Sequence, residues 1–167
     1  MTITADIYGG IKGREHVVDG PTGRVVTHEV GLNTAFVDGL TDFKADRIWS
    51  DERTLSASAS DSLDLAGGLT DSAGAAITFA KVRAIVVKAA LANGADIVVG
   101  GAASNTFTGP FGGATHTVAV KPGGTLVLCA PKTGWPVTAT TGDILKILNG
   151  SGSASATYQI AILGNSA

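Results

Sequence analysis

Apolar positions along the chain occur in short runs that are separated by turn-forming residues. The strongest run, residues 82–87, holds four β-branched side chains, which pack well on a pleated sheet and lose rotamer freedom in a helix. A helical period fails there, because at about 100° per residue Lys81 falls near Ile85 and no polar face forms. The run therefore predicts a central strand of a β-sheet, buried on both faces.

Two turn signals suggest how the neighbouring strands connect. Asn93-Gly94 readily takes the positive φ values of a type I′ turn, so we predict a hairpin between residues 82–87 and 97–99. Further along, Pro122 and Gly123 occupy the second and third positions that a type II turn needs. This turn is expected to lead from a strand at 115–120 into a return strand at 125–130.

The whole pattern favours an all-β fold. About eight strands follow residue 46, with turn signals every 8–12 residues, which is typical of an antiparallel β-sandwich and favours a jelly-roll-like form. No βαβ alternation and no exact internal repeat appears. We assign residues 46–167 to this sandwich domain.

Residues 1–45 have a different character. They are rich in glycine, including the Gly20-Pro21 pair, and their apolar residues are too few to form a core of their own. We predict an extended N-terminal arm or hairpin that docks on the main body or on a neighbouring subunit.

Composition supports a protein that works by packing against other proteins. Hydrophobic residues make up 44% of the chain and charged residues only 16%, below the usual quarter. A net charge of −2 gives no electrostatic case for nucleic-acid binding. The first six residues lack the features of a secretion signal, and no run reaches the roughly 18 apolar residues of a membrane helix. We therefore expect a protein folded in a cytoplasm, with no membrane partner.

Candidate chemistry is sparse. Cys129 lies in an apolar run and reads as a buried strand thiol, and three scattered histidines show no metal-ligand spacing. Asp61, Asp64 and Asp71 resemble turn carboxylates more than a calcium loop. No nucleophile elbow and no phosphate-binding loop is present. We expect no enzymatic activity, no cofactor and no metal site.

Aromatic residues in two loops are the candidate contact residues. Phe107 and Phe111 lie in a Gly/Thr/Pro-rich loop, and Trp135 lies in a second loop. Exposed aromatics in such loops anchor protein contacts or stack on sugars. The alternative is that they fold back and close one end of the sandwich, and both interpretations stay open.

Several stretches together carry a family resemblance. They are residues 63–71, 77–82 and 98–105, followed by Pro122-Gly123-Gly124, Gly134-Trp135, and residues 143–147 and 158–160. Over residues 50–164 this pattern resembles a group of small structural proteins of tailed bacteriophages.

The resemblance implies a virion component that is assembled in the host cytoplasm. The first expectation is a capsid decoration (cement) protein that binds and stabilises the assembled head. Its partners would be the major capsid protein or other virion proteins, and copies of itself in a homotrimer or another homo-oligomer. The alternative is a tail or fibre protein with a receptor-binding or carbohydrate-binding role, and a non-viral adhesion or scaffold domain is a third possibility.

Overall fold

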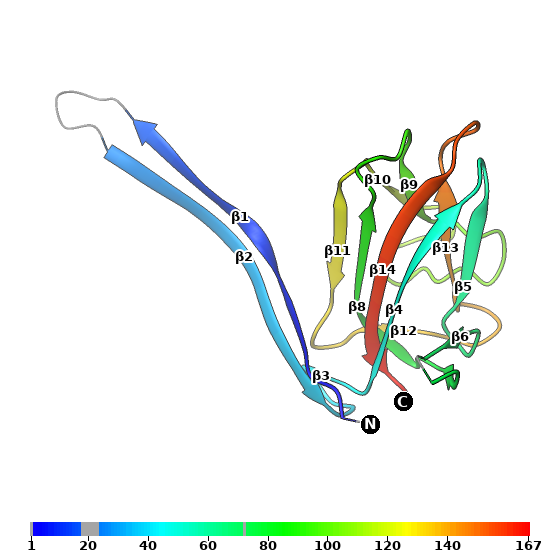
Figure 1. The fold of residues 1–167 in the computed structure, drawn as a ribbon. Helices are drawn as coiled ribbons and strands as arrows, with labels where there is room; N and C mark the ends of the chain where they lie inside the picture. Colours follow the sequence, from blue (N-terminus) through cyan, green and yellow to red (C-terminus); the bar gives the residue numbers. More distant parts are fainter. Residues whose placement is uncertain (1, 18–23, 72) are drawn as a thin grey trace.

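A computed structural model describes residues 2–17, 24–71 and 73–167, and the regular structure in these ranges consists of strands. A five-stranded sheet and a four-stranded sheet form a sandwich, and a long hairpin projects from it (Figure 1). The first sheet has the order β11 (Thr125–Cys129), β8 (Lys81–Ala89), β14 (Ala156–Asn165), β4 (Arg47–Leu55). The second has the order β10 (Thr117–Val120), β9 (Ile97–Gly100), β13 (Ile144–Asn149), β5 (Ser60–Asp64).

Strand pairing in the sandwich is antiparallel and nested. β4 pairs with β14, β5 with β13, β8 with β11 and β9 with β10, and the pairs β8–β14 and β9–β13 join them into two sheets. β12 (Trp135–Pro136) adds to β8, while β6 (Leu69–Thr70) and β7 (Ala76–Ile77) pair with each other. The predicted antiparallel β-sandwich with an extended N-terminal arm is confirmed, and its jelly-roll form stays a prediction.

The predicted hairpin at Asn93-Gly94 is wrong. β8 and β9 belong to different sheets, so the chain crosses the sandwich between them. The Asn93 side chain is instead bound to β14: its amide nitrogen donates to the Thr157 carbonyl at 2.9 Å, and its oxygen accepts from the Thr157 N–H at 2.8 Å. Neither Asn93 nor Gly94 has a positive φ, which a type I′ turn would require.

The turn at residues 121–124 forms, but it does not close a hairpin. Gly123 has φ 75°, and the Gly124 N–H donates to the Lys121 carbonyl at 2.7 Å, as a type II turn requires. β10 and β11 nevertheless lie in different sheets, so the expected return strand pairs with β8 instead. The turn therefore connects the two layers.

β8 is an inner strand of its sheet, as predicted. Val82, Ile85 and Val87 are fully buried in the core between the sheets. A bulge at Arg83, opposite the Leu163–Gly164 step of β14, returns Val82 to the core side, whereas Ala84, next to Ile85, packs on the other side of the sheet with Leu163. This other side, the outer face of the sheet, is where the arm is attached.

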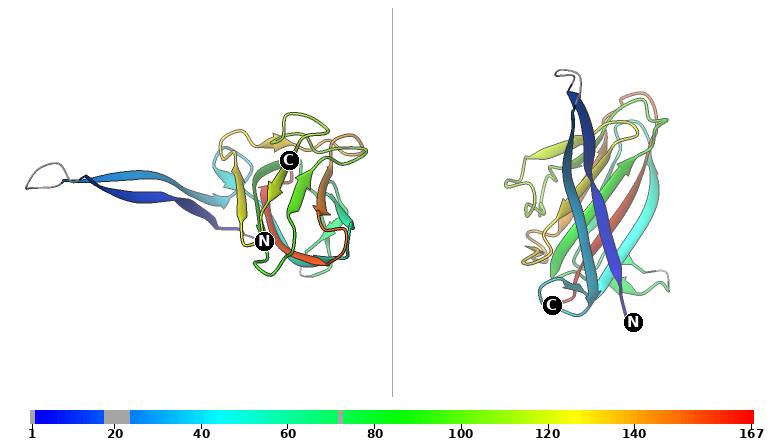
Figure 2. Two further views of the ribbon diagram at one scale, coloured as in Figure 1. Left: turned by 90° about the horizontal axis from the view of Figure 1, so that it is seen from above. Right: turned by 90° about the vertical axis from the view of Figure 1, so that its left-hand side faces the viewer.

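The arm consists of β1 (Ala5–Val17) and β2 (Arg24–Asp38), which pair from Ala5 opposite Phe36 to Val17 opposite Arg24. The short strand β3 (Lys44–Ala45) runs parallel to the end of β2 and leads into the sandwich. At about 3.3 Å per residue, β1 is about 43 Å long. Figure 2 shows the arm extending clear of the sandwich. The Gly20-Pro21 pair lies outside the described residues.

Candidate docking site

The root of the arm is fixed on the outer face of the β8–β14 sheet by a hydrophobic cluster that is separate from the main core. This root cluster consists of Ile3, Ile7, Phe36, Ala45, Ala84 and Leu163, with Ala5, Leu32 and Cys129 packed against it. Burying one large apolar side chain contributes about 1.5–3 kcal/mol. Several such side chains hold the root in one position on the sandwich.

Arg83 reinforces the root from within the β8 bulge. Its side chain is 2% exposed, and its Nε donates to the Asn165 side-chain oxygen at 2.6 Å. Its two η nitrogens donate to four backbone carbonyls, those of Leu40, Thr41, Pro131 and Lys132. No carboxylate of the described residues forms an ion pair with it. Arg83 thus ties the loop after β2, the loop after β11 and the C-terminal strand to one point.

Beyond the root, the same face of the arm becomes exposed to solvent. Directly opposite residues of paired strands share a face, so the row of Ile7 and Phe36 continues into the pair Ile11 and Val30. Ile11 is 78% exposed and Val30 is 80% exposed. We call these two residues the distal arm stripe. It has the same apolar character as the root cluster, and it lines a shallow pocket with Val127 of β11 but stays largely exposed.

A glycine pair lies near the middle of the arm, beside the distal arm stripe. Gly10 lies opposite Gly31, and a Cβ atom on Gly10 would lie 2.5 Å from the Val30 carbonyl oxygen. The strands approach closely only because no side chain is present there. Figure 1 shows the arm curving away from the sandwich as it extends, which leaves the distal arm stripe largely exposed.

The distal arm has little support of its own. Its charged pairs are exposed and cross-strand: Lys12 Nζ lies 2.8 Å from Glu29 Oε2, and His28 Nε2 lies 3.4 Å from Glu15 Oε2. Exposed pairs of this kind contribute at most about 1 kcal/mol each. In the described part of the chain the outer edges of β1 and β2 are unpaired apart from the contact with β3. A two-stranded ribbon gains stability when a partner covers its face or adds to its edge.

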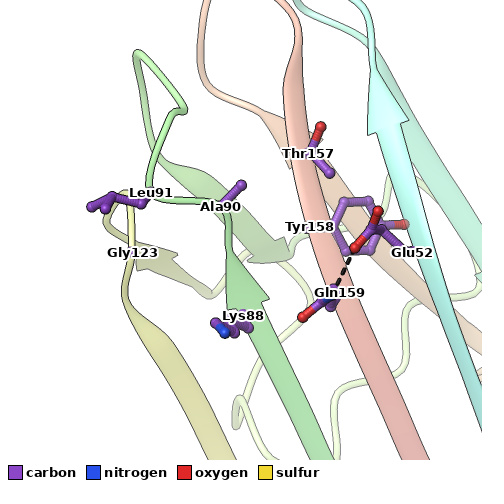
Figure 3. Close-up of a pocket in the computed structure, with 8 residues that line it drawn as sticks. All are labelled: Glu52, Lys88, Ala90, Leu91, Gly123, Thr157, Tyr158 and Gln159. Carbon is purple, nitrogen blue, oxygen red and sulfur yellow. Dashed lines mark hydrogen bonds between the residues drawn. The ribbon is translucent and has the colours of Figure 1, made fainter.

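The outer face of the β8–β14 sheet is only partly covered by the arm. The uncovered part, which we call the outer patch, begins with Ile48 beside Leu163. It continues above Ala84 and Leu163 with the apolar side chains of Val86, Ala161 and Val127, and then with Lys88, Gln159, Glu52 and Thr125. A shallow groove of about 490 Å³ crosses the middle of the patch, between β4, β14, β8 and β11. At its upper end Gln159 donates to Glu52 at 2.6 Å, and Lys88 lies on the adjacent strand (Figure 3).

The sequence-predicted contact residues lie at one end of the sandwich. Phe107 is 1% exposed and belongs to the main core, so its ring presents almost no surface. Phe111 and Trp135 are half-buried and pack against the same core. Trp135 also packs on Gly109, where a Cβ atom would lie 2.5 Å from the Trp135 Cβ. A partner-contact role for Phe111 and Trp135 stays a prediction.

The aspartates and the cysteine that the sequence offered as candidates for chemistry make contacts that stabilise the fold. Asp71 accepts hydrogen bonds from the N–H groups of Ala73 and Ala75, and Asp61 accepts from the Tyr158 hydroxyl at 2.6 Å. Burial raises the pKa of the Cys129 thiol, which lowers its thiolate fraction near neutral pH. Within residues 2–17, 24–71 and 73–167, no three His, Cys, Asp or Glu side chains are grouped closely enough to hold a metal ion.

Sequence reasoning missed Arg83 and the outer patch. Arg83 interrupts an apolar run in the sequence. A charged residue at such a position indicates a bulge or a buried polar contact, and it could have identified this site. The outer patch mixes small, apolar and charged residues from four strands, so it is visible only once their pairing is known. The arm itself was expected from its composition.

In the part of the chain that the structure describes, no helix is long and apolar enough to span a membrane. Comparison with known proteins finds no matching family model, no similar curated protein and no similar solved structure.

Proposed function

We propose that the protein is a non-enzymatic structural protein that works by docking on other protein subunits through its N-terminal arm. The observation that carries the proposal is the distal arm: an apolar stripe, exposed by about four-fifths, on a ribbon with free strand edges. Such a surface is costly to leave in water and ready to add to a partner. The rigid root directs it away from the body.

More specifically, we propose a capsid decoration (cement) protein of a tailed bacteriophage, located in the virion. The resemblance over residues 50–164 supports this assignment. The nested pairing of the sandwich strands, first with last and second with seventh, supports a jelly roll. The partners would be the major capsid protein or other virion proteins, with the protein itself present as a homotrimer or another homo-oligomer.

The proposed mechanism is mechanical. A subunit that binds the assembled shell but not its separated parts stabilises the shell by mass action. Many identical sites on a symmetric shell add avidity, so no single contact needs to be strong. An arm with a fixed root suits this task, because little orientational freedom is lost when its free end docks.

The second candidate function is receptor or carbohydrate binding on a tail or fibre. The side chains of Phe111, in a loop, and Trp135, in the short edge strand β12, favour it, because both are only half-buried at one end of the sandwich. A glycan array with wild type and Trp135→Ala separates the two candidates: a signal that the substitution abolishes favours the tail or fibre role.

Immunogold electron microscopy of the source's virus particles, with antibody against the purified chain, tests the location directly. Gold distributed over the heads is the expected result for a decoration protein. Gold confined to the tails contradicts the decoration role and favours the receptor-binding role. Absence of gold, when the epitope is shown to be accessible on the native protein, contradicts a virion location.

A further inference from the structure

We infer that the distal arm stripe of one copy docks on the outer patch of the next copy, in a head-to-tail contact that closes several copies into a ring. The inference rests on the proposed function, because it assumes that the arm is a docking element. It goes further by naming both surfaces and by assigning the contact to a second copy of this chain.

The root cluster is the first part of the argument, since it is an intramolecular version of the same contact. There, Ile7 and Phe36 on one face of the arm cover Ala84 and Leu163 on the outer face of the sheet. Both surfaces continue past the root in the same direction. The arm face continues as Ile11 and Val30, and the sheet face continues as Val86 and Ala161. Each continuation lacks the partner that the other would supply.

Charge follows the apolar residues in the same order on both surfaces. On the arm, the Ile11–Val30 row is followed by Glu15 and His28 on the same face. On the sheet, the Val86–Ala161 row is followed by Lys88 and Glu52 (Figure 3). The arm row therefore leads to the Glu15 carboxylate and the sheet row leads to the Lys88 ammonium, which allows opposite charges to meet at the rim of the contact.

One chain does not complete this contact with itself. Within its own molecule the stripe meets the outer patch only at its edge, where Ile11, Val30 and Val127 line a shallow pocket of about 360 Å³, and Ile11 and Val30 remain about four-fifths exposed. The two surfaces are different patches of one molecule, so the contact between copies is heterologous. A heterologous contact generates a closed ring when its rotation closes, and every copy in the ring then both gives and receives an arm.

Sedimentation velocity on the full chain and three single variants tests the inference. Val30→Arg places a charge on the stripe, and Ala161→Arg fills the middle of the outer patch. Tyr8→Arg is the matched control, because Tyr8 is 81% exposed and lies on the opposite face of the arm, across from Asn33. Wild type and the Tyr8 variant are expected to sediment as one oligomer, and the other two as monomers. Thermal unfolding followed by circular dichroism verifies that each variant is folded.

A mixture of the two monomeric variants gives the sharper result. The Ala161 variant keeps an intact arm and the Val30 variant keeps an intact patch, so an equimolar mixture is expected to form a heterodimer through one working contact. The other possible contact, between the Val30→Arg arm and the Ala161→Arg patch, would bring two arginines together and is expected not to form. A mixture that remains monomeric, or a wild-type chain that remains monomeric at high concentration, overturns the inference.

Failure here is distinguishable from failure of the proposed function. A wild-type monomer that still labels virus heads in the immunogold experiment leaves the decoration role intact and makes the capsid protein the occupant of the arm. A ring-forming chain that labels no particle keeps the inference and overturns the proposed function.

Discussion

Arg83 is a buried cation whose acceptors are an amide oxygen and backbone carbonyls. Replacing it by Met preserves much of the volume but removes one donor from each of four carbonyls and from the Asn165 oxygen, and only the carbonyls of Thr41 and Pro131 keep a backbone donor. Losing hydrogen bonds from a charged donor in a buried site costs about 2–4 kcal/mol of the free energy of unfolding. Urea unfolding of Arg83→Met measures this loss. Arg14→Met, at an exposed position of β1 on the face away from the distal arm stripe, is the control and is expected to change stability by less than about 0.5 kcal/mol. Equal losses in the two variants would contradict the role of Arg83.

Tyr158 links stability to alkaline pH. Burial of the ring, followed by the hydrogen bond to Asp61, raises the pKa of the Tyr158 hydroxyl far above its usual value near 10. In the unfolded chain this hydroxyl ionises near pH 10, whereas in the folded chain it stays protonated. Its contribution is therefore complete below pH 10 and falls above it, by about 1.4 kcal/mol per pH unit.

Tyr158→Phe tests this linkage. At pH 7 the substitution is expected to cost about 1 kcal/mol, because the hydrogen bond to Asp61 is lost. Above pH 10 the decline of stability with pH is expected to be shallower in the variant than in wild type. Urea unfolding at pH 7, 9, 10 and 10.5 measures both effects, and parallel declines in the two proteins would rule out Tyr158 as the source.

At the scale of elements, the arm root is expected to open as a unit. Cys129 is the single cysteine of the chain and packs against the root cluster, so its reaction with a thiol reagent reports the opening of the arm. Phe36→Ala removes the most buried large side chain of the cluster and is expected to accelerate the reaction at least tenfold. Tyr8→Ala, on the exposed opposite face, is expected to leave the rate unchanged. Measuring the rate from pH 7 to 9 separates a change in access from a change in the pKa of the thiol.

Local sequence predicted strands far better than it predicted their partners. The apolar run at residues 82–87 depends only on its own side chains, and it forms the expected inner strand. Its partners are β11 and β14, and β14 lies more than 60 residues away along the chain. The turn signals at Asn93-Gly94 and Pro122-Gly123 describe a change of direction, which connects two sheets as readily as two neighbours in one sheet. Strand pairing in a nested sandwich is decided by packing between residues far apart in the sequence, and a short stretch of sequence carries no information about such packing.

The candidate docking site could likewise be predicted only in part from the sequence. The arm was predicted because glycine-rich composition with few apolar residues is a local property. Packing of the arm on the main body was one of two expectations, but the residues of the root and the outer patch were not predicted, since Ala84, Cys129 and Leu163 come together only after three strands pair. Phe107 stood out in the sequence as an aromatic in a loop, yet the loop returns to the core and buries it.

At the scale of the whole molecule, the same chain carries both a projecting arm and a receiving surface. If copies join arm to patch before they reach the shell, then the ring and not the single chain is the binding unit. Several weak contacts per ring then add through avidity, and a variant that breaks the ring loses all but one of them.

This reasoning predicts how variants act on heads that lack the protein. Wild type and Tyr8→Arg are expected to raise the temperature at which heads release their DNA, whereas Val30→Arg is expected to require at least tenfold more protein for the same effect. A dye that fluoresces on released DNA, recorded during heating over a series of protein concentrations, measures the shift. Equal concentration dependence for Val30→Arg and wild type would mean that single copies are the binding unit. In that case the free edges of β1 and β2, which all three proteins share, would be the part of the arm that contacts the shell.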